Sequence, residues 1–174
     1  MKIAITGRMC SGKTTLANMI KQTDSRYEIF SLGGKVKEVA SDLFGMEGKD
    51  RSLLISIGAH MREIDSDVWV KYILKKTANN NFCIIDDLRY ENEYNALVNK
   101  GFKIINLVVN PSLQIERIIR IYPNNYEDHL KNREHKSETR EWLDKDKRVN
   151  LIINSGEDIK CINQKVYAFL SKLT

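Results

Sequence analysis

The chain has 174 residues, of which 42% are hydrophobic and 29% are charged. This length fits one domain with an ordinary core, and this composition excludes an intrinsically disordered chain. Lysine and arginine outnumber aspartate and glutamate by 28 to 23, and the resulting net charge of +5 suits an anionic ligand but is too diffuse to predict nucleic-acid binding.

Cysteine usage and hydropathy predict an intracellular setting. The three cysteines lack C-x-x-C spacing, so neither a metal site nor a disulfide framework is indicated, and Cys83 is expected to be a buried thiol. The first predicted strand begins at Lys2, which leaves no room for a signal peptide, and no apolar run has membrane-spanning length. We therefore expect a cytoplasmic protein.

The first predicted elements are a strand over Lys2–Thr6, a glycine-bounded loop and a helix over Lys13–Lys21. The loop follows the pattern G-x-x-x-x-G-K-T in the strand–loop–helix context typical of phosphate-binding loops. Its glycines let backbone N–H groups approach phosphate, its lysine can reach the β- and γ-phosphates, and its threonine hydroxyl can bind Mg²⁺. We expect ATP to be bound here by Gly7, Cys10, Ser11, Gly12, Lys13, Thr14 and Thr15.

A strand and three helices are predicted next. The strand covers Tyr27–Leu32, and helical spacing of apolar residues follows over Lys35–Phe44, Arg51–Met61 and Val68–Thr77. Residues 33–78 are expected to bind the phosphate acceptor, opposite the triphosphate.

Two cations of this acceptor region could hold a phosphate group. Lys37 and Arg62 are the candidates, and an arginine guanidinium can bind phosphate through two parallel N–H groups, that is, bidentately. Trp69 lies at helical spacing with Val70 and Ile73, which is more typical of a core position than of a base-stacking platform.

The next predicted strand, Phe82–Ile85, ends in two aspartates. Its continuous apolar run indicates a buried parallel strand, and ligands of such sheets bind beyond the carboxyl ends of the strands. Asp86 or Asp87 is therefore expected to face Mg²⁺, directly or through water, with Arg89 near the same crevice. A solvated strand end or a helix cap is the alternative for the aspartates.

The remaining elements continue the alternation of helices and strands. They are a helix over Glu91–Lys100, a strand over Lys103–Val109, a helix over Ser112–Ile121 with a serine N-cap, a strand over Asn150–Asn154 and a helix over Glu157–Leu173. This order predicts an α/β fold, a P-loop NTPase three-layer sandwich with a mainly parallel five-stranded sheet and helices on both faces. No linker or repeat divides residues 1–174, so we expect a single domain.

A polar, charge-dense stretch precedes the last strand. It contains Arg117, Arg120, Arg133 and Arg140. Arginines on a mobile segment can offset the charge of a transferring phosphoryl group, and such a segment excludes water. Residues 117–148 are therefore expected to form a helical lid, with a solvated helix–loop–helix as the alternative.

In this order the motifs resemble the deoxynucleoside monophosphate kinases of phages and large DNA viruses. The likeness covers nearly the whole chain and includes the phosphate loop, Leu-Gly-Gly from residue 32, Asp-Val-Trp-Val from 67, Asp-Leu-Arg-Tyr-Glu-Asn-Glu from 87, His-Lys-Ser-Glu from 135 and Ile-Asn-Ser-Gly from 153. The resemblance implies ATP- and Mg²⁺-dependent phosphorylation of a (deoxy)nucleoside 5′-monophosphate to the diphosphate. The chain departs from the phage enzymes in having Thr14 where they have aspartate.

Motifs and resemblance together give a set of candidate site residues. The catalytic candidates are Lys13, Asp87, Arg89, Arg117, Arg120 and Arg133. The acceptor-binding candidates are Gly33, Lys37, Arg62, Asp67, Trp69, Arg89, Glu93, His135 and Glu138. Asn154 joins the loop as an ATP-binding candidate, and Thr14, Asp86 and Asp87 are the metal candidates. His135 is expected to orient the lid rather than to act as a base, because a phosphate acceptor is already anionic.

Three other functions are kept as alternatives. A P-loop kinase of dephospho-coenzyme A or phosphomevalonate would have a similar outline. A regulatory GTP switch requires Asp-x-x-Gly after the third strand and Asn-Lys-x-Asp for guanine, and neither occurs. A nucleic-acid-stimulated ATPase is not favoured by the mixed charge pattern. The expected partner is a nucleotide substrate, with no nucleic acid or membrane; a homodimer and a viral or phage gene are compatible with the sequence.

Overall fold

The computed structural model describes residues 1–139, 141–144 and 148–172. Five strands form one sheet in the order β2-β3-β1-β4-β5, and all neighbouring strands are parallel. The strands are β1 (Lys2–Gly7), β2 (Glu28–Phe30), β3 (Cys83–Leu88), β4 (Lys103–Val108) and β5 (Val149–Asn154). The predicted α/β sandwich with a parallel five-stranded sheet is confirmed.

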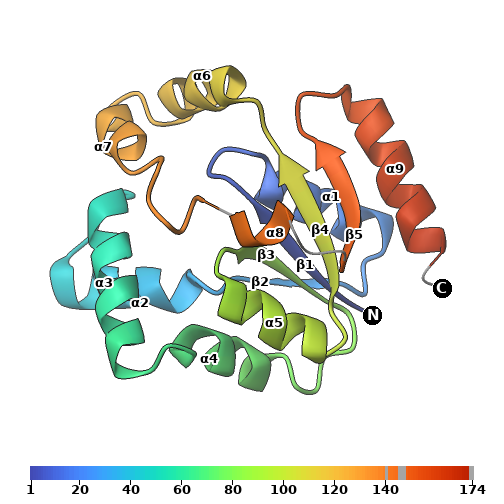
Figure 1. The fold of residues 1–174 in the computed structure, drawn as a ribbon, viewed down its shortest axis with the longest axis horizontal. Coiled ribbons are helices and arrows are strands. Elements are labelled where there is room, and N and C mark those ends of the chain that lie inside the picture. Colours follow the sequence, from blue (N-terminus) through green and yellow to red (C-terminus); the bar gives the residue numbers. More distant parts are fainter. Residues whose placement is uncertain (140, 145–147, 173–174) are drawn as a thin grey trace.

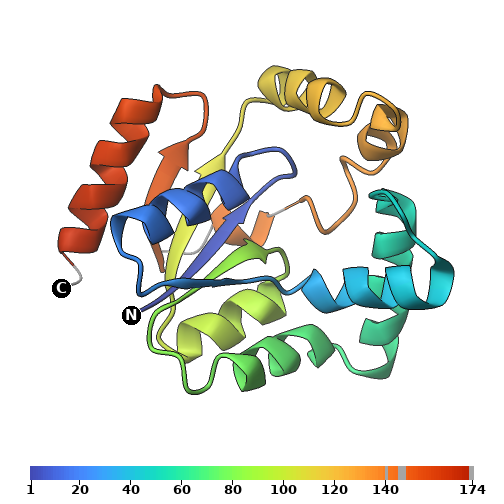
Figure 2. The same ribbon diagram turned by 180° about the vertical axis from the view of Figure 1, so that it is seen from behind.

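Helices connect the strands and cover both faces of the sheet. They are α1 (Lys13–Thr23), α2 (Gly34–Phe44), α3 (Arg51–Ile64), α4 (Val68–Lys76), α5 (Glu91–Asn99), α6 (Pro111–Ile121), α7 (Tyr126–Lys131), α8 (Glu141–Asp144) and α9 (Ile159–Ser171). In Figures 1 and 2, α1 and α9 cover one face, and α5 and α8 cover the other. The α2–α3 and α6–α7 pairs curve around the carboxyl end of the sheet, where ligands of open α/β sheets bind (Figure 1).

The buried strand residues form two cores, one on each face of the sheet. Ile84 packs with Leu16 of α1 and Val166 of α9. Its neighbour Ile85 belongs to the opposite core, with Tyr94 of α5. Because helices cover both faces, the strands are continuous apolar runs rather than alternating ones. Burying each such side chain contributes about 1.5–3 kcal/mol to folding.

Two helix starts differ from the prediction, for local reasons. The side chain of Asn110 accepts a hydrogen bond from Ser112 N at 2.9 Å, so Asn110 is the N-cap of α6 and the predicted serine cap at Ser112 is wrong. The proline that follows Asn110 then occupies the first turn, where its missing N–H costs nothing. In the same way Asp158 caps α9, which therefore begins at Ile159.

The strand ends also differ from the prediction. β2 has only three residues and pairs with β3 at one edge of the sheet. β3 continues past Ile85 to Leu88, so Asp86 and Asp87 are part of the strand rather than beyond it. The polar stretch contains the short helices α7 and α8, which the charge pattern did not delimit.

Three further expectations concern single positions and segments. Cys83 is a buried free thiol, as predicted. No helix among the described residues has both the length and the apolar character of a membrane span. Arg140 and residues 145–147, all part of the predicted lid, lie outside the described residues.

Candidate active site

The loop between β1 and α1 has the backbone geometry of an anion-binding nest. Gly12 has a left-handed φ of 95°, and Cys10 has a φ of 57° although it carries a side chain. A Cβ atom at Gly7 would come within 2.7 Å of the carbonyl oxygen of Leu107, so only glycine fits there. Since α1 begins at Lys13, the free N–H groups and the positive end of this helix point to the same place.

Lys13 is folded back onto this loop. Its Nζ donates to the carbonyl oxygens of Gly7 and Arg8, both at 2.7 Å. An ATP phosphate would give the same ammonium group a charged acceptor, which makes a stronger hydrogen bond than a carbonyl does. Phosphate binding by Lys13 stays a prediction.

Thr14 and Asp86 form the candidate metal site. The Thr14 hydroxyl donates to Asp86 Oδ2 at 2.8 Å. Burial, and then the charge of Asp87, raise the pKa of the Asp86 carboxyl. A cation at this carboxylate would relieve both effects. No group of three His, Cys, Asp or Glu side chains within the described residues could hold a metal by itself, but Mg²⁺ often takes one or two protein oxygens and completes its shell with phosphates and water. The Thr14–Asp86 pair fits that requirement.

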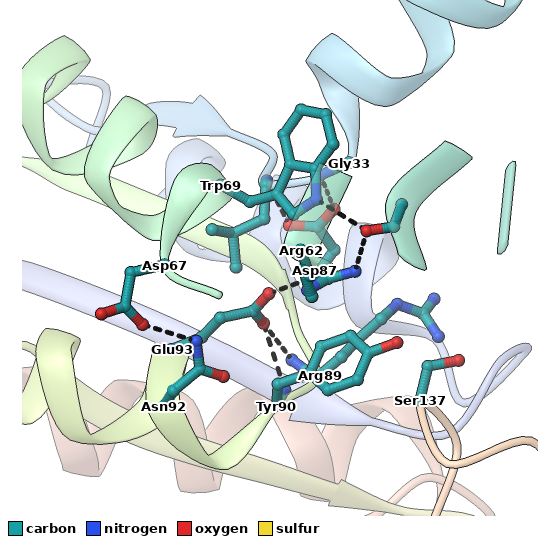
Figure 3. Close-up of polar contacts among 12 residues, drawn as sticks. Gly33, Arg62, Asp67, Trp69, Asp87, Arg89, Tyr90, Asn92, Glu93 and Ser137 are labelled. Atoms are coloured by element: carbon teal, nitrogen blue, oxygen red, sulfur yellow. Dashed lines mark hydrogen bonds and ion pairs between the residues drawn. The ribbon is translucent and has the colours of Figure 1, made fainter. Parts of the chain in front are cut away.

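Asp87 is engaged on the neighbouring loop instead. Its oxygens accept hydrogen bonds from the Ser31 hydroxyl at 2.6 Å, Leu32 N at 2.6 Å and Gly33 N at 2.8 Å. Figure 3 shows the contact with Gly33. These bonds hold the β2–α2 junction, so the geometry favours Asp86 over Asp87 as the metal-facing carboxylate.

A cleft of about 630 Å³ extends from the phosphate loop to α2 and α3, a size that suits a small ligand. Most predicted site residues line it, namely Cys10, Ser11, Gly12, Lys13, Thr14, Thr15, Gly33, Lys37, Arg62, Trp69, Asp86, Asp87, Arg89, Glu93, Arg117 and Arg120. Gly7, Asp67, Arg133, His135, Glu138 and Asn154 are not among its lining residues. The fold thus brings residues from distant parts of the chain to one site.

Three of the residues outside the cleft have local contacts. Asp67 accepts from the Asn92 side chain at 2.8 Å, as Figure 3 shows. Asn154 accepts from the N–H of residue 156 at 2.9 Å and so shapes the turn after β5. Arg133 pairs with Glu134 at 3.1 Å. Binding or catalytic roles for Asp67, Asn154 and Arg133 remain predictions.

Arg62 forms part of the cleft wall. Its guanidinium donates to Glu93 Oε1 and to the Gly58 carbonyl, both at 2.9 Å, and its Cζ lies 3.9 Å from the centroid of the Tyr90 ring (Figure 3). The indole N–H of Trp69 donates to the same Gly58 carbonyl at 3.2 Å. Both terminal nitrogens of Arg62 are therefore engaged, and its fork is not free for a phosphate in this arrangement.

Glu93 also caps α5. Its Oε2 accepts from the backbone N–H groups of Arg89 and Tyr90, at 3.2 and 3.1 Å. Burial raises the pKa of Glu93, and the neighbouring Arg62 acts in the opposite direction. The capping box at the start of α5 therefore places Glu93 where it can pair with Arg62.

Glu138 joins three distant segments of the chain. It is completely buried, and its Oε1 accepts hydrogen bonds from Arg51 and Arg89. Its Oε2 accepts from the backbone N–H of Met9, in the phosphate loop, at 2.6 Å. Nearby, His135 Nδ1 accepts the backbone N–H of Ser137 at 3.2 Å, and an orienting role for this histidine stays a prediction. Arg51 was not predicted, because a single arginine at a helix start carries no signal of its distant partner.

Lys49 and Tyr122, which also line the cleft, belong to a second unpredicted group. Lys49 Nζ donates to the Tyr122 hydroxyl at 2.9 Å, and the Tyr122 ring stacks on His129 with centroids 3.9 Å apart. Burial lowers the pKa of Lys49 and of His129 and raises that of Tyr122. Lys49 belongs to a short connection between helices, where no sequence pattern marks it.

Two predicted lid arginines lie at the other side of the phosphate loop. Arg117 donates to the Cys10 carbonyl at 3.3 Å, and to the Ser155 hydroxyl at 3.0 Å and carbonyl at 2.7 Å. It thereby links the phosphate loop to the turn after β5. Arg120 lines the cleft with its side chain 69% exposed, and its nearest carboxylate, Glu116, is 4.0 Å away.

Comparison with known proteins identifies the family and the fold of the chain. The family model described as an AAA domain (AAA_18) matches residues 3–142. Similar solved structures include a gluconokinase from Sinorhizobium meliloti 1021 (TM-score 0.63, 14% identity, 99% of this chain and 92% of that chain). A second is a sugar kinase from Janibacter sp. HTCC2649 (TM-score 0.65, 12% identity, 98% of this chain and 94% of that chain). A third is TT1252 from Thermus thermophilus (TM-score 0.63, 15% identity, 100% of this chain and 98% of that chain). No curated protein matches the chain. The P-loop kinase-like fold is thus confirmed, whereas the deoxynucleoside monophosphate kinase family is not singled out.

Proposed function

We propose that this chain, which belongs to the AAA domain family, is a kinase that transfers the γ-phosphoryl group of ATP to a (deoxy)nucleoside 5′-monophosphate. The observation that supports this acceptor is the charge distribution of the cleft. Five cations line its acceptor side, namely Lys37, Lys49, Arg51, Arg62 and Arg89.

The three carboxylates that line this part of the cleft already accept hydrogen bonds from protein groups. Asp86 accepts from Thr14, Asp87 holds the β2–α2 junction, and Glu93 is paired with Arg62. A hydroxyl acceptor needs a general base to take its proton, whereas a phosphate acceptor is already anionic and needs positioning and positive charge. The cleft therefore suits a phosphate-bearing acceptor better than a neutral sugar.

The proposed roles follow from where each group lies. The loop amides and Lys13 would bind the β- and γ-phosphates of ATP. Thr14 and Asp86 would hold Mg²⁺, which when bound offsets the negative charge of the phosphates. Lys37 makes no side-chain hydrogen bond within the described residues, so its ammonium group is available to an acceptor. We retain residues 33–78 as the acceptor region and 117–148 as the lid, since both contribute to the cleft wall.

A hydroxyl acceptor on a sugar or sugar acid is the second candidate. It is favoured by the names of two similar structures, a gluconokinase and a sugar kinase, although at 14% and 12% identity these show the fold alone. Phosphomevalonate remains an alternative whose accepting group is a phosphate. Dephospho-coenzyme A remains an alternative whose accepting group is a ribose hydroxyl, although the molecule itself is anionic.

The test is a coupled ADP-release assay with ATP–Mg²⁺ and one acceptor at a time. The panel contains all ribo- and deoxynucleoside monophosphates, dephospho-coenzyme A, phosphomevalonate, gluconate and glucose. We expect strong stimulation by one or a few nucleoside monophosphates. Stimulation only by acceptors other than nucleoside monophosphates, or by nothing in the panel, would overturn the proposal.

A further inference from the structure

The buried carboxylate of Glu138 contacts both halves of the cleft. We propose that Glu138 is a positioning residue that couples the ATP site to the acceptor site, so that each ligand binds more tightly when the other is present. This inference rests on the proposed function, because it takes ATP to bind at the phosphate loop and a phosphate group to bind near Arg51 and Arg89.

The first step concerns the phosphate loop. Met9 lies in the loop, and its N–H donates to Glu138 Oε2 at 2.6 Å. A hydrogen bond to a charged acceptor is stronger than one between neutral groups. Because Glu138 is completely buried, its carboxylate cannot touch a ligand without moving. It can therefore act only through the groups that it holds.

The second step concerns the two arginines. Arg51 Nη2 and Arg89 Nη1 both donate to the same oxygen, Glu138 Oε1. Two positive charges share one negative charge, so the group of three keeps a net positive charge. Neither guanidinium uses its fork bidentately on Glu138, and Arg51 Nε has no hydrogen-bond partner within the described residues. Arg51 and Arg89 both line the cleft, where this residual charge favours an anion.

The third step concerns the segment that carries Glu138. Asp128, ten residues earlier, accepts from the backbone N–H groups of Arg51 at 2.8 Å and Ser52 at 3.3 Å. Asn132 donates to the Ser52 hydroxyl at 3.0 Å. The segment is therefore fastened to the start of α3 at one end and to the phosphate loop at the other.

The coupling follows from these contacts. ATP phosphates that fix the loop amides also fix the Met9 N–H, and through it Glu138 and both arginines. An acceptor phosphate that fixes Arg51 and Arg89 acts on the loop by the same route in reverse. Such coupling is reciprocal by thermodynamic necessity, and its usual size is about 5- to 150-fold in affinity.

The chain contains a matched control for this inference. Glu93 is also buried and paired with an arginine of the cleft wall, Arg62, at 2.9 Å. Its other hydrogen bonds go to the backbone N–H groups of Arg89 and Tyr90, not to the phosphate loop. Loss of the Glu93 charge should therefore disturb the acceptor wall without uncoupling the two sites.

The experiment measures the affinity of the nucleoside monophosphate that stimulates most strongly in the acceptor panel. Titration calorimetry is done with and without a saturating non-hydrolysable ATP analogue and Mg²⁺. In the wild type we expect the analogue to tighten acceptor binding by about fivefold or more. In Glu138→Gln we expect the ratio of the two affinities to fall to about 1, and in Glu93→Gln to stay at the wild-type value.

Folding of each variant is checked first by circular dichroism and thermal melting, because Glu138→Gln leaves two buried arginines with a neutral partner. If that variant does not fold, the pair Arg51→Met/Glu138→Gln removes one positive charge as well, and the same loss of coupling is expected. The inference is overturned, with the proposed function intact, by either of two results. One is that the ATP analogue leaves the acceptor affinity of the wild type unchanged. The other is that Glu138→Gln shows the same ratio of the two affinities as the wild type. Absence of any acceptor in the panel overturns the proposed function and this inference with it.

Discussion

Glu138 accepts a hydrogen bond from the backbone N–H of Met9 at 2.6 Å, although 129 positions separate the two residues. The contact joins a segment of the predicted lid to the phosphate loop. The same carboxylate holds Arg51 and Arg89. The phosphate loop and the two cleft-lining arginines are thus physically connected through one buried group.

The position of Lys13 predicts a variant that is inactive but folded. Lys13→Ala removes the ammonium group that would neutralise the β- and γ-phosphates, and we expect the rate of transfer to fall by at least about 100-fold. Its Nζ donates to the carbonyl oxygens of Gly7 and Arg8 in its own loop, and we expect the far-ultraviolet circular dichroism of the variant to equal that of the wild type. A Lys13→Ala enzyme of wild-type rate in the ADP-release assay would contradict the proposed mechanism.

The two aspartates of β3 should behave differently. Asp86→Asn is expected to raise the Mg²⁺ concentration needed for half-maximal activity by tenfold or more, because it removes the carboxylate beside Thr14. Asp87→Asn breaks up the set of hydrogen bonds at the β2–α2 junction, which should cost about 1–3 kcal/mol of stability. Mg²⁺ titrations and urea unfolding of both variants distinguish the roles. Equal Mg²⁺ responses in the two variants would show that the assignment to Asp86 is wrong.

The raised pKa of Asp86 predicts a pH-dependent stability difference. Burial makes the folded state bind this proton more tightly than the unfolded chain does. The contribution of Asp86 to stability is therefore most favourable below the unfolded pKa, and it is lost as the pH rises through the higher folded pKa. Near neutral pH and without Mg²⁺ we expect Asp86→Asn to melt above the wild type. Each 1 kcal/mol corresponds to about 2–4 °C in a domain of this size.

This difference should shrink as the pH falls through the folded pKa toward the unfolded value of 3.8, below which the carboxyl is protonated in both states. Thermal melts of the wild type and Asp86→Asn between about pH 4 and 8 test the sign. A difference that grows on acidification would contradict the stated cause.

Arg62 is expected to contribute mainly to stability. Arg62→Met leaves the buried Glu93 carboxylate without its ion-pair partner, and the expected loss is up to about 3 kcal/mol, since Arg62 itself is partly exposed. The double variant Arg62→Met/Glu93→Gln should recover part of this loss. Urea unfolding of the single and double variants gives the coupling energy, and additive losses would argue against the pair as the cause.

Lys37 is expected to bind the acceptor. Lys37→Ala should raise the acceptor KM by tenfold or more and leave the ATP KM nearly unchanged, because Lys37 lines the cleft from α2, in the proposed acceptor region. Lys35→Ala is the matched control, since Lys35 is exposed and pairs with Glu38 at 2.7 Å. Equal effects of the two substitutions would indicate a general effect of charge rather than a specific contact.

Local patterns in the sequence predicted most of the fold. The phosphate loop was predicted because its function requires glycines, a lysine and a threonine at fixed spacing. The order of strands and helices was predicted because burial on both faces of a parallel sheet demands continuous apolar runs. Errors fell at element ends, such as the start of α6, where an asparagine and a serine two residues apart are both good caps. The short helices α7 and α8 of the polar stretch were not delimited either.

What the sequence determined by itself was therefore the fold class, the nucleotide-binding loop and the set of polar residues near the strand ends. Only the tertiary structure decided which partners these residues have. It placed Asp86 beside Thr14, and Asp87 at the β2–α2 junction. It also paired Arg62 with Glu93, and Arg51 with Glu138. The physical reason is that loop patterns and periodicity act over a few residues. The partner of a buried charge is instead set by packing between segments far apart in the chain, and it leaves no local trace in the sequence.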